Sequence, residues 1–378
     1  MTSLNSPTPI SIRRGTPADL PELIDLVDLS FAEEGQESSR LSQLLPHLFT
    51  PTRAGDYFIA EMGGRMVATI GLYPYPLRVG RVIFQTAGVG QVCTTPEARN
   101  QGAMSSLLRA VCQEADRYDF TWLYGDRLRY GRYGWTAGGW TYRFETGRRY
   151  LPPPPEGKVE SFDPARHLDR LQAALALLPQ SLVMPDEELR LSLRGQKAQG
   201  LSGAFWGKSF VLGRDSGQVV LAGDGDPDEL GALLAYQATG RQKIHVDCAP
   251  QPSALLETCL AHYSWFQVSP SASFRIGDIG SFLAKAVELA GDLSVPFQGE
   301  LGLVNQGNGQ AATLVWRDGR ICVEEGAGRG AFHLTHQRLS EVCFGLLPLS
   351  LLLPGLPVGS PFNQVLPVKI FISELFAL

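Results

Sequence analysis

The sequence lacks paired cysteines and lacks an excess of basic residues. Its 6 cysteines are scattered without a C-x-x-C pair, which is typical of reduced, buried small residues and not of a disulfide framework. The 33 Lys and Arg against 38 Asp and Glu give a formal net charge of −5, so the basic footprint of a nucleic-acid-binding protein is missing. We therefore expect a reduced protein with no nucleic-acid partner.

A long hydrophobic run is also missing. The longest apolar segment, 344–358, is interrupted by Gly and Pro and is too short to cross a bilayer. The first ten residues, MTSLNSPTPI, lack the basic and apolar regions of a signal peptide. We expect a cytoplasmic protein without a membrane partner, and the length of 378 residues predicts two or three domains.

The most informative stretch is 84–108, FQTAGVGQVCTTPEARNQGAMSSLL, which predicts a strand, a tight turn and a helix. An apolar run ends at Thr94, before Pro96, whose missing N–H stops ladder pairing. From about Gly102 the apolar residues recur at the spacing of one helical face; they are Met104, Leu107, Leu108 and Val111.

A helix that begins after such a turn can hold a pyrophosphate. The N–H groups of its first turn have no internal partner, and the helix dipole adds about half a positive charge there. Gly102 permits a close approach of the backbone, and Arg99 supplies a charge-assisted contact.

The segments around this stretch predict a mixed α/β unit. Strands are expected at 10–13, at 57–61 and 65–72 around a Gly-Gly hairpin, and at 122–124. A helix is expected from Thr16, which with Asp19 forms a capping box, and another over 41–49.

The spacing Arg99-x-x-Gly102-x-Met104 after a strand resembles the acetyl-coenzyme-A signature of the GNAT N-acetyltransferase superfamily, whose last position is usually Gly or Ala. The order of elements is similar to that of the same superfamily. The resemblance implies a coenzyme site of nine residues; they are Val92, Cys93, Thr94, Arg99, Asn100, Gln101, Gly102, Ala103 and Met104.

The run Tyr130-Gly-Arg-Tyr-Gly-Trp resembles that of one branch, the enhanced-intracellular-survival proteins. The resemblance implies that Tyr130 protonates the leaving thiolate and that the carboxylate of the last residue, Leu378, is the base. The branch commonly ends in an aromatic residue, whereas here Ala377 and Leu378 follow Phe376, so Glu374 is a substitute candidate.

The clearest domain boundary is the polyproline segment 151–157. It divides a catalytic acetyltransferase domain, 1–150, from a second domain, 151–270, whose order of elements loosely repeats the first. Between Cys248 and the helix expected over 254–263, Pro250 and Pro252 remove the N–H donors that a phosphate needs, so we expect no coenzyme there. Residues 271–378 resemble a sterol-carrier-like α+β domain. The predicted fold class is α/β (α+β), with tandem acetyltransferase-like domains, the second degenerate.

The resemblance implies an N-acetyltransferase that uses acetyl-coenzyme A and an amine acceptor, including aminoglycosides or other polyamines. It also implies a ring-like homo-oligomer, a trimer or hexamer. Asp28, Glu33 and Glu34 are candidate carboxylates for a cationic amine. The alternative is a non-catalytic acyl-coenzyme-A sensor or scaffold whose third domain binds an apolar ligand or a partner; the departure at Met104 favours it.

Two other chemistries have less support. Cys93 as an acyl-carrying nucleophile lacks a nearby His, and a cysteine in mid-strand usually packs. The pairs His245/Cys248 and His333/His336 have no further ligands at zinc-like spacing, so no metal is expected.

Overall fold

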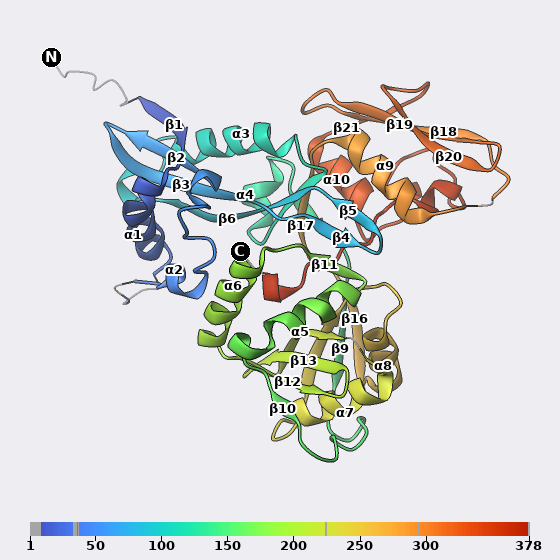
Figure 1. Cartoon of the computed structure of the whole chain (residues 1–378). Coiled ribbons are helices and arrows are strands. Elements are labelled where there is room, and N and C mark those ends of the chain that lie inside the picture. Colours follow the sequence, from blue (N-terminus) through green and yellow to red (C-terminus); the bar gives the residue numbers. More distant parts are fainter. Residues whose placement is uncertain (1–8, 33–35, 37, 224, 294, 377–378) are drawn as a thin grey trace.

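The computed structural model of the chain describes residues 9–32, 36, 38–223, 225–293 and 295–376. Three lobes are visible in Figure 1: a first unit at the upper left, a second below it and a third at the upper right. Within the described residues, no helix combines the length and apolar character needed to cross a membrane.

The first unit is built on a seven-stranded sheet. In spatial order its strands are β1 (Ile10–Arg14), β2 (Tyr57–Met62), β3 (Arg65–Pro74), β6 (Thr86–Thr94), β7 (Phe120–Leu123), β17 (Ala272–Ile276) and β8 (Thr136–Gly138). Its helices are η1 (Pro17–Asp19), α1 (Leu20–Ser30), α2 (Leu41–Leu44), η2 (Ala54–Asp56), η3 (Pro96–Ala98), α3 (Ala103–Ala115) and α4 (Arg127–Gly131). Neighbouring strands are antiparallel except β6 and β7, which are parallel.

The second unit repeats this arrangement. Its strands are β10 (Glu160–Ser161), β12 (Leu201–Trp206), β13 (Ser209–Arg214), β14 (Gln218–Gly223), β15 (Ile244–Cys248), β9 (Thr141–Thr146) and β16 (Trp265–Ser269). Its helices are α5 (Pro164–Leu177), α6 (Asp186–Ala198), α7 (Pro227–Gln237) and α8 (Ala254–His262). Again the fourth and fifth strands, β14 and β15, are the parallel pair.

The two sheets exchange one strand each. The sixth strand of the first sheet is β17, which follows the second unit in the chain. The sixth strand of the second sheet is β9, which precedes the other strands of the second unit in the chain. The sheets therefore do not coincide with the sequence boundaries at 150 and 270, because 141–146 pairs in the second sheet and 272–276 in the first. We keep the three-part division as a proposal, with these two strands exchanged.

The third unit has a four-stranded sheet. Its strands are β20 (Arg320–Glu325), β19 (Ala311–Arg317), β18 (Gly299–Asn305) and β21 (Phe332–Leu334). Its helices are α9 (Ile279–Ala290), α10 (His336–Phe344), α11 (Leu349–Leu352) and η4 (Pro361–Gln364), and the described chain ends in η5 (Glu374–Phe376). A small sheet of β11 (Gln180–Leu182), β4 (Leu77–Val79) and β5 (Val82–Phe84) joins the first two units.

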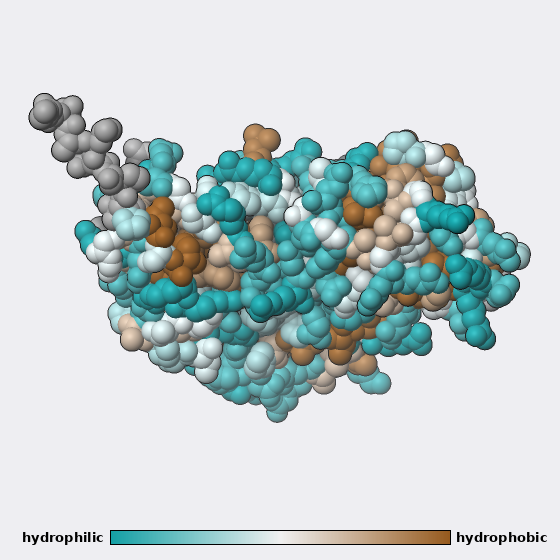
Figure 2. All heavy atoms as spheres, turned by 90° about the horizontal axis from the view of Figure 1, so that it is seen from above, coloured by the Kyte–Doolittle hydropathy of each residue, from teal (hydrophilic) through white to brown (hydrophobic). Residues whose placement is uncertain are grey.

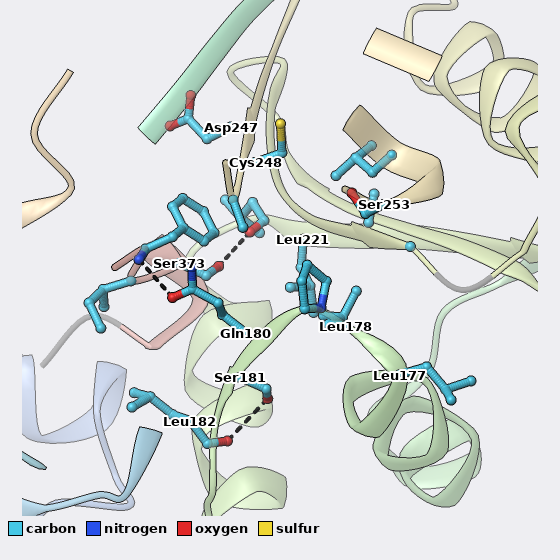
Figure 3. A pocket seen from close by; sticks show the side chains of 18 of the residues that line it. Leu177, Leu178, Gln180, Ser181, Leu182, Leu221, Asp247, Cys248, Ser253 and Ser373 are labelled. Carbon is cyan, nitrogen blue, oxygen red and sulfur yellow. Dashed lines mark hydrogen bonds between the residues drawn. The ribbon is translucent and has the colours of Figure 1, made fainter. Parts of the chain in front are cut away.

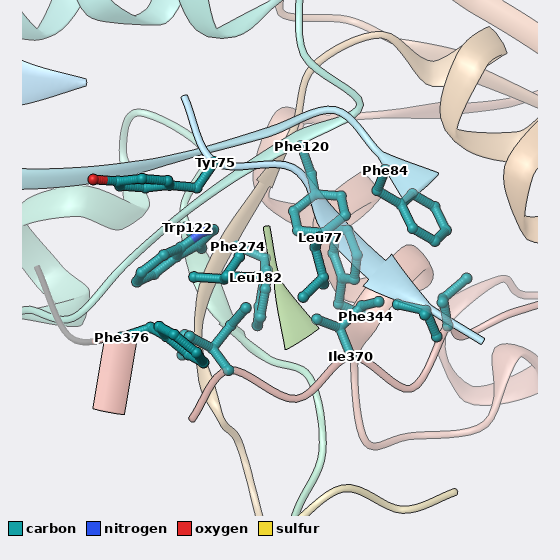
Figure 4. Packing of buried hydrophobic residues seen from close by; sticks show 14 of the residues in the cluster. Tyr75, Leu77, Phe84, Phe120, Trp122, Leu182, Phe274, Phe344, Ile370 and Phe376 are labelled. Carbon is teal, nitrogen blue, oxygen red and sulfur yellow. The ribbon is translucent and has the colours of Figure 1, made fainter. Parts of the chain in front are cut away.

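One hydrophobic cluster runs through all three units. In it Phe344 of α10 packs on Phe120 of β7 and Phe274 of β17, with ring centroids 5.0 and 4.9 Å apart (Figure 4). The face in Figure 2 is mainly hydrophilic, with separated hydrophobic patches. The apolar surface that holds the units together is thus largely buried between them.

The elements expected from the sequence differ from the structure mainly in length. The helix expected over 41–49 ends at Leu44, because residues 45–49 continue as turns. The capping box of Thr16 and Asp19 is confirmed, although it opens η1 and α1 begins only at Leu20. The mixed α/β fold with two acetyltransferase-like sheets is confirmed.

Candidate active site

The site begins where β6 and β7 separate. They pair in parallel only between Thr86–Gly88 and Phe120–Trp122, although β6 continues to Thr94. On its other side β6 remains paired with β3 as far as Thr94. Among the described residues, the β7-facing edge of 89–94 therefore has no partner strand, and its backbone N–H and C=O groups can pair with a ligand.

A bulge marks this separation. Gln91 has a positive φ of 48° and lies beside a register shift between β3 and β6. It is buried, and the Tyr73 hydroxyl donates a hydrogen bond of 2.5 Å to its Oε1. Because a bulge bends a strand and increases its twist, it accounts for the divergence of β6 from β7.

The turn after β6 presents the start of α3 to the same space. Asn100 and Gly102 adopt left-handed backbone conformations, with φ of 64° and 89°. A Cβ on Gly102 would meet nothing within 4 Å, so glycine is required there for its backbone conformation and not for space. The N-terminus of the 13-residue α3 carries no acidic residue in its first turn, which keeps it favourable for an anion.

A groove of about 790 Å³ joins these features. Eight of the nine predicted coenzyme-site residues line it; they are Val92, Cys93, Thr94, Arg99, Asn100, Gly102, Ala103 and Met104. The ninth, Gln101, is absent from the lining, and its side-chain amide donates to the carbonyl of Glu97 at 2.6 Å. The structure thus brings together residues that the sequence places in one strand and one helix start.

Other lining residues were missed or only weakly indicated by the sequence. Arg129 and Arg132 come from α4 and its C-cap, and Ser30 and Phe31 from the end of α1. With Arg99 the groove has three guanidinium groups, which matches a ligand that carries several phosphates. Because α4 lies about thirty residues from Arg99 along the chain, nothing in the sequence places Arg132 in the same groove as Arg99.

Tyr130 lies on α4 beside Arg129. The helix is capped by Asp126, whose Oδ1 accepts from the N–H of Arg129 at 2.8 Å. The Tyr130 ring packs edge-on against Trp135, with centroids 6.5 Å apart, and leaves the residue 7% exposed. Burial raises the pKa of Tyr130 above its usual value, against the opposing charge of Arg129. The phenol is therefore held neutral near neutral pH.

The C-terminal segment, residues 369–376, lies between the first two units. Figure 1 shows η5, in red, near the centre of the molecule. Phe376 is buried in the cluster that contains Trp122 of β7 (Figure 4), and the Tyr124 hydroxyl donates to the carbonyl of Ile372 at 3.3 Å. Leu378, the predicted donor of the terminal carboxylate, lies outside the described residues.

The substitute base Glu374 is partly engaged elsewhere. Its Oε1 lies 3.8 Å from a guanidinium nitrogen of Arg143, and its side chain is 45% exposed. Burial raises the pKa of Tyr124, and the charges of Glu374 and Asp247 raise it further. Glu374 is therefore near Tyr124 and also in contact with Arg143.

Of the candidate acidic residues for a cationic acceptor, Asp28 has a structural role. It accepts hydrogen bonds from the backbone N–H and the hydroxyl of Ser42, at 2.9 and 2.6 Å, and so ties α1 to α2. Glu33 and Glu34 lie outside the described residues.

The structure offers little support for a cysteine nucleophile or a metal centre. Burial raises the pKa of the Cys93 thiol to about 12, so a thiolate is disfavoured. His336 is bonded to Arg275, with a nitrogen separation of 3.0 Å. In the part of the chain that the structure describes, no three His, Cys, Asp or Glu residues gather as metal ligands.

Residues 11–138 match the family model of the acetyltransferase (GNAT) domain. This range contains β6, the turn, α3 and α4, and the match confirms the predicted resemblance. No curated protein matches the sequence.

Solved structures share the fold along nearly the whole chain. The GCN5-related N-acetyltransferase from Anabaena variabilis has a TM-score of 0.68 at 16% identity, over 97% of this chain and 98% of its own. That from Kribbella flavida has a TM-score of 0.65 at 18% identity, over 92% and 91%. Eis1 from Mycobacterium abscessus has a TM-score of 0.66 at 13% identity, over 98% and 99%. At such identities the likeness concerns the fold.

Proposed function

We propose that this chain, an acyl-coenzyme-A-dependent N-acetyltransferase by its GNAT domain, transfers acetyl from acetyl-coenzyme A directly to an amine. One observation carries the proposal: the unpaired edge of β6, the N-terminus of α3 and three arginines meet in a single groove. Each of these parts suits a different portion of the coenzyme.

The pyrophosphate binds at the start of α3. There the free N–H groups of the first turn and Arg99 neutralise its charge, with Arg129 and Arg132 on the facing wall. The pantetheine arm pairs with the backbone of Cys93 and Thr94 as an added strand, which brings the thioester to the point where β6 and β7 separate.

The chemistry joins the amine nitrogen to the carbonyl carbon and breaks the carbon–sulfur bond. A backbone N–H near Val92 stabilises the negative charge that develops on the carbonyl oxygen. Tyr130 donates its proton to the departing thiolate, whose own pKa is near 8.5. Burial raises the pKa of Tyr130, so the phenol carries its proton near neutral pH.

The base that accepts the proton of the amine is the terminal carboxylate. Supporting this, Ile372 accepts a hydrogen bond from Tyr124, and Phe376 packs in one cluster with Trp122 of β7. An ordinary α-carboxyl has a pKa of about 3.5, so it acts through water or after burial raises that pKa. Glu374 is the alternative.

The second unit binds no coenzyme, but the reason differs from the one expected. The element that corresponds to α3 is α7, which follows the parallel strand β14, and not α8 with its preceding prolines. The N-terminus of α7 is capped by Asp226 and carries Asp228 and Glu229 in its first turn. These carboxylates occupy and repel the position that a phosphate requires.

The acceptor is an amine, and the resemblance to the enhanced-intracellular-survival branch favours aminoglycosides or other polyamines. The same resemblance supports a cytoplasmic trimer or hexamer. Sedimentation of the purified protein measures its oligomeric state. The proposed coenzyme site depends neither on that state nor on the identity of the acceptor.

The experiment is release of free coenzyme-A thiol from acetyl-coenzyme A with aminoglycosides, polyamines, amino acids and Lys-containing peptides as acceptors. Turnover with any amine supports the transferase, and the preferred amine defines the acceptor class. Tight coenzyme binding without turnover across the panel favours the sensor or scaffold alternative.

A further inference from the structure

A second cavity lies in the second unit, at the place that corresponds to the coenzyme groove of the first (Figure 3). The strands β14 and β15 pair in parallel only at Gln218–Val219 and His245–Val246, although they continue to Gly223 and Cys248. The second sheet therefore opens as the first does. The cavity has a volume of about 270 Å³ and is lined by both diverging strands.

The C-terminal segment lies at the point where β14 and β15 separate. The Ser373 hydroxyl donates to the carbonyl of Val220 on β14 at 2.6 Å. Gln180 accepts from the N–H of Phe371 and donates to the carbonyl of Lys369, both at 2.9 Å. The segment thus forms one wall of the cavity and is fixed to the opposite walls by hydrogen bonds.

The remaining walls are mainly apolar. They are formed by Leu178, Leu182, Leu221, Leu255, Phe371 and Phe376, among others. The polar side chains in the lining have partners inside the protein. The two oxygens of Asp247 accept from Arg143 at 2.7 and 2.6 Å, and Ser253 caps α8.

This lining selects an uncharged occupant. The charge of Asp247 is balanced by Arg143, so a charged ligand would lose its hydration without gaining a free counter-charge. An aliphatic body gains from burial against the leucines. The volume of about 270 Å³ is slightly below that of drug-sized ligand sites, which usually measure about 300 to 1,000 Å³, so the occupant is small.

We propose that this cavity binds a small neutral aliphatic molecule, which holds the C-terminal segment in its place between the first two units. The segment has one side on the cavity and the other on the first unit, where Tyr124 binds Ile372 and Phe376 packs in the cluster of Trp122. Its effect on catalysis rests on the proposed function, because the terminal carboxylate follows this segment.

Binding is tested on the full chain with 1-hexanol as the probe, by saturation-transfer NMR and titration, beside hexanoate and hexylamine. We expect 1-hexanol to bind at least about tenfold more tightly than either charged analogue. Ala249→Leu, which fills the cavity from a buried lining position, weakens binding by about tenfold, whereas Ala198→Leu on the exposed end of α6 leaves it unchanged.

A second variant tests the same proposal if Ala249→Leu fails to fold. Leu178→Ala enlarges the cavity and shifts the preference from 1-hexanol to 1-octanol. Absence of 1-hexanol binding to the unaltered chain, equal binding of the three probes, or an unchanged preference in Leu178→Ala overturns the proposal.

The effect on the segment is read from acetyl transfer. Saturating 1-hexanol changes kcat of the unaltered chain by at least about twofold and leaves that of Ala249→Leu unchanged. If 1-hexanol binds and kcat does not move, the link to the segment is wrong. If no amine is acetylated even without 1-hexanol, the proposed function fails while the binding result still decides the cavity.

Discussion

At the scale of single residues, Tyr130 is the proposed acid, and it lies beside Arg129, which lines the groove. It is almost fully buried against Trp135 on a capped helix, and burial keeps its phenol protonated. The resemblance of the run 130–135 to the enhanced-intracellular-survival proteins indicated this residue. It could not indicate Arg132, because only the fold places the end of α4 across from the start of α3.

Tyr130→Phe removes the proposed proton donor and keeps the ring packing. We expect kcat to fall by about 100-fold or more, with little change in the KM for acetyl-coenzyme A, because the phenol acts only in the transition state. Steady-state thiol release measures both constants. Tyr133→Phe, three residues away, is the matched control, and an unchanged kcat in Tyr130→Phe removes the acid assignment.

His47 provides a test of stability against pH. It is 1% exposed, its Nδ1 has no hydrogen-bond partner among the described residues, and burial lowers its pKa to about 3. Its unfolded pKa is near 6.5, so the unfolded chain gains a proton below that pH while the folded chain does not. The contribution of His47 to the free energy of unfolding is therefore fully present above about pH 6.5 and is lost as the pH falls toward 3.

The expected loss from His47 between pH 7 and pH 5 is about 2 kcal/mol. His47→Gln, which keeps a polar side chain but does not titrate, removes this part of the pH dependence. Urea denaturation at several pH values measures it. Parallel pH profiles for the variant and the unaltered chain contradict the account of His47.

At the scale of elements, the sequence predicted where helices begin but not which strands pair with one another. Thr16 and Asp19 form the capping box that the sequence predicts. By contrast, nothing in the sequence of β9 or β17 reveals that each completes the sheet of another unit. Strand pairing depends on partners far along the chain, whereas a helix cap is decided within four residues.

The same limit explains the comparison of α7 with α8. In the sequence, a strand ends at Cys248 and is followed by prolines and a helix. This order predicts that the strand corresponds to β6 and the helix to α3. The structure gives that position to β14 and α7, because only β14 makes the parallel pair that opens the sheet.

In the proposed function, the C-terminal segment contains one candidate base, Glu374, and is followed by the other, the terminal carboxylate. Extending the chain by a Gly-Ser-Gly-Ser peptide moves the terminal carboxylate without altering η5 or the residues before it. We expect kcat to fall about tenfold or more and coenzyme binding to stay unchanged, since the groove lies on β6 and α3.

Glu374→Gln in the unextended chain separates the two candidate bases. If the extension leaves kcat unchanged and Glu374→Gln lowers it, Glu374 is the base. If both variants keep full activity, neither carboxylate accepts the proton.

At the scale of the whole molecule, one sheet topology occurs twice, and we propose that only one copy binds coenzyme. Both sheets have the same order of pairings and the same opening between the fourth and fifth strands. The difference lies in charge. The groove at α3 has three arginines, whereas the start of α7 has three carboxylates.

The measurement that tests this account most directly is a calorimetric titration of coenzyme A into the full chain. We predict one molecule bound per chain, with affinity at least about tenfold weaker in Arg99→Glu and unchanged in Arg65→Glu, an equally drastic change at an exposed position outside the groove. Two molecules per chain, no binding, or equal affinity in Arg99→Glu would contradict the assignment of the groove at β6 and α3 as the single coenzyme site.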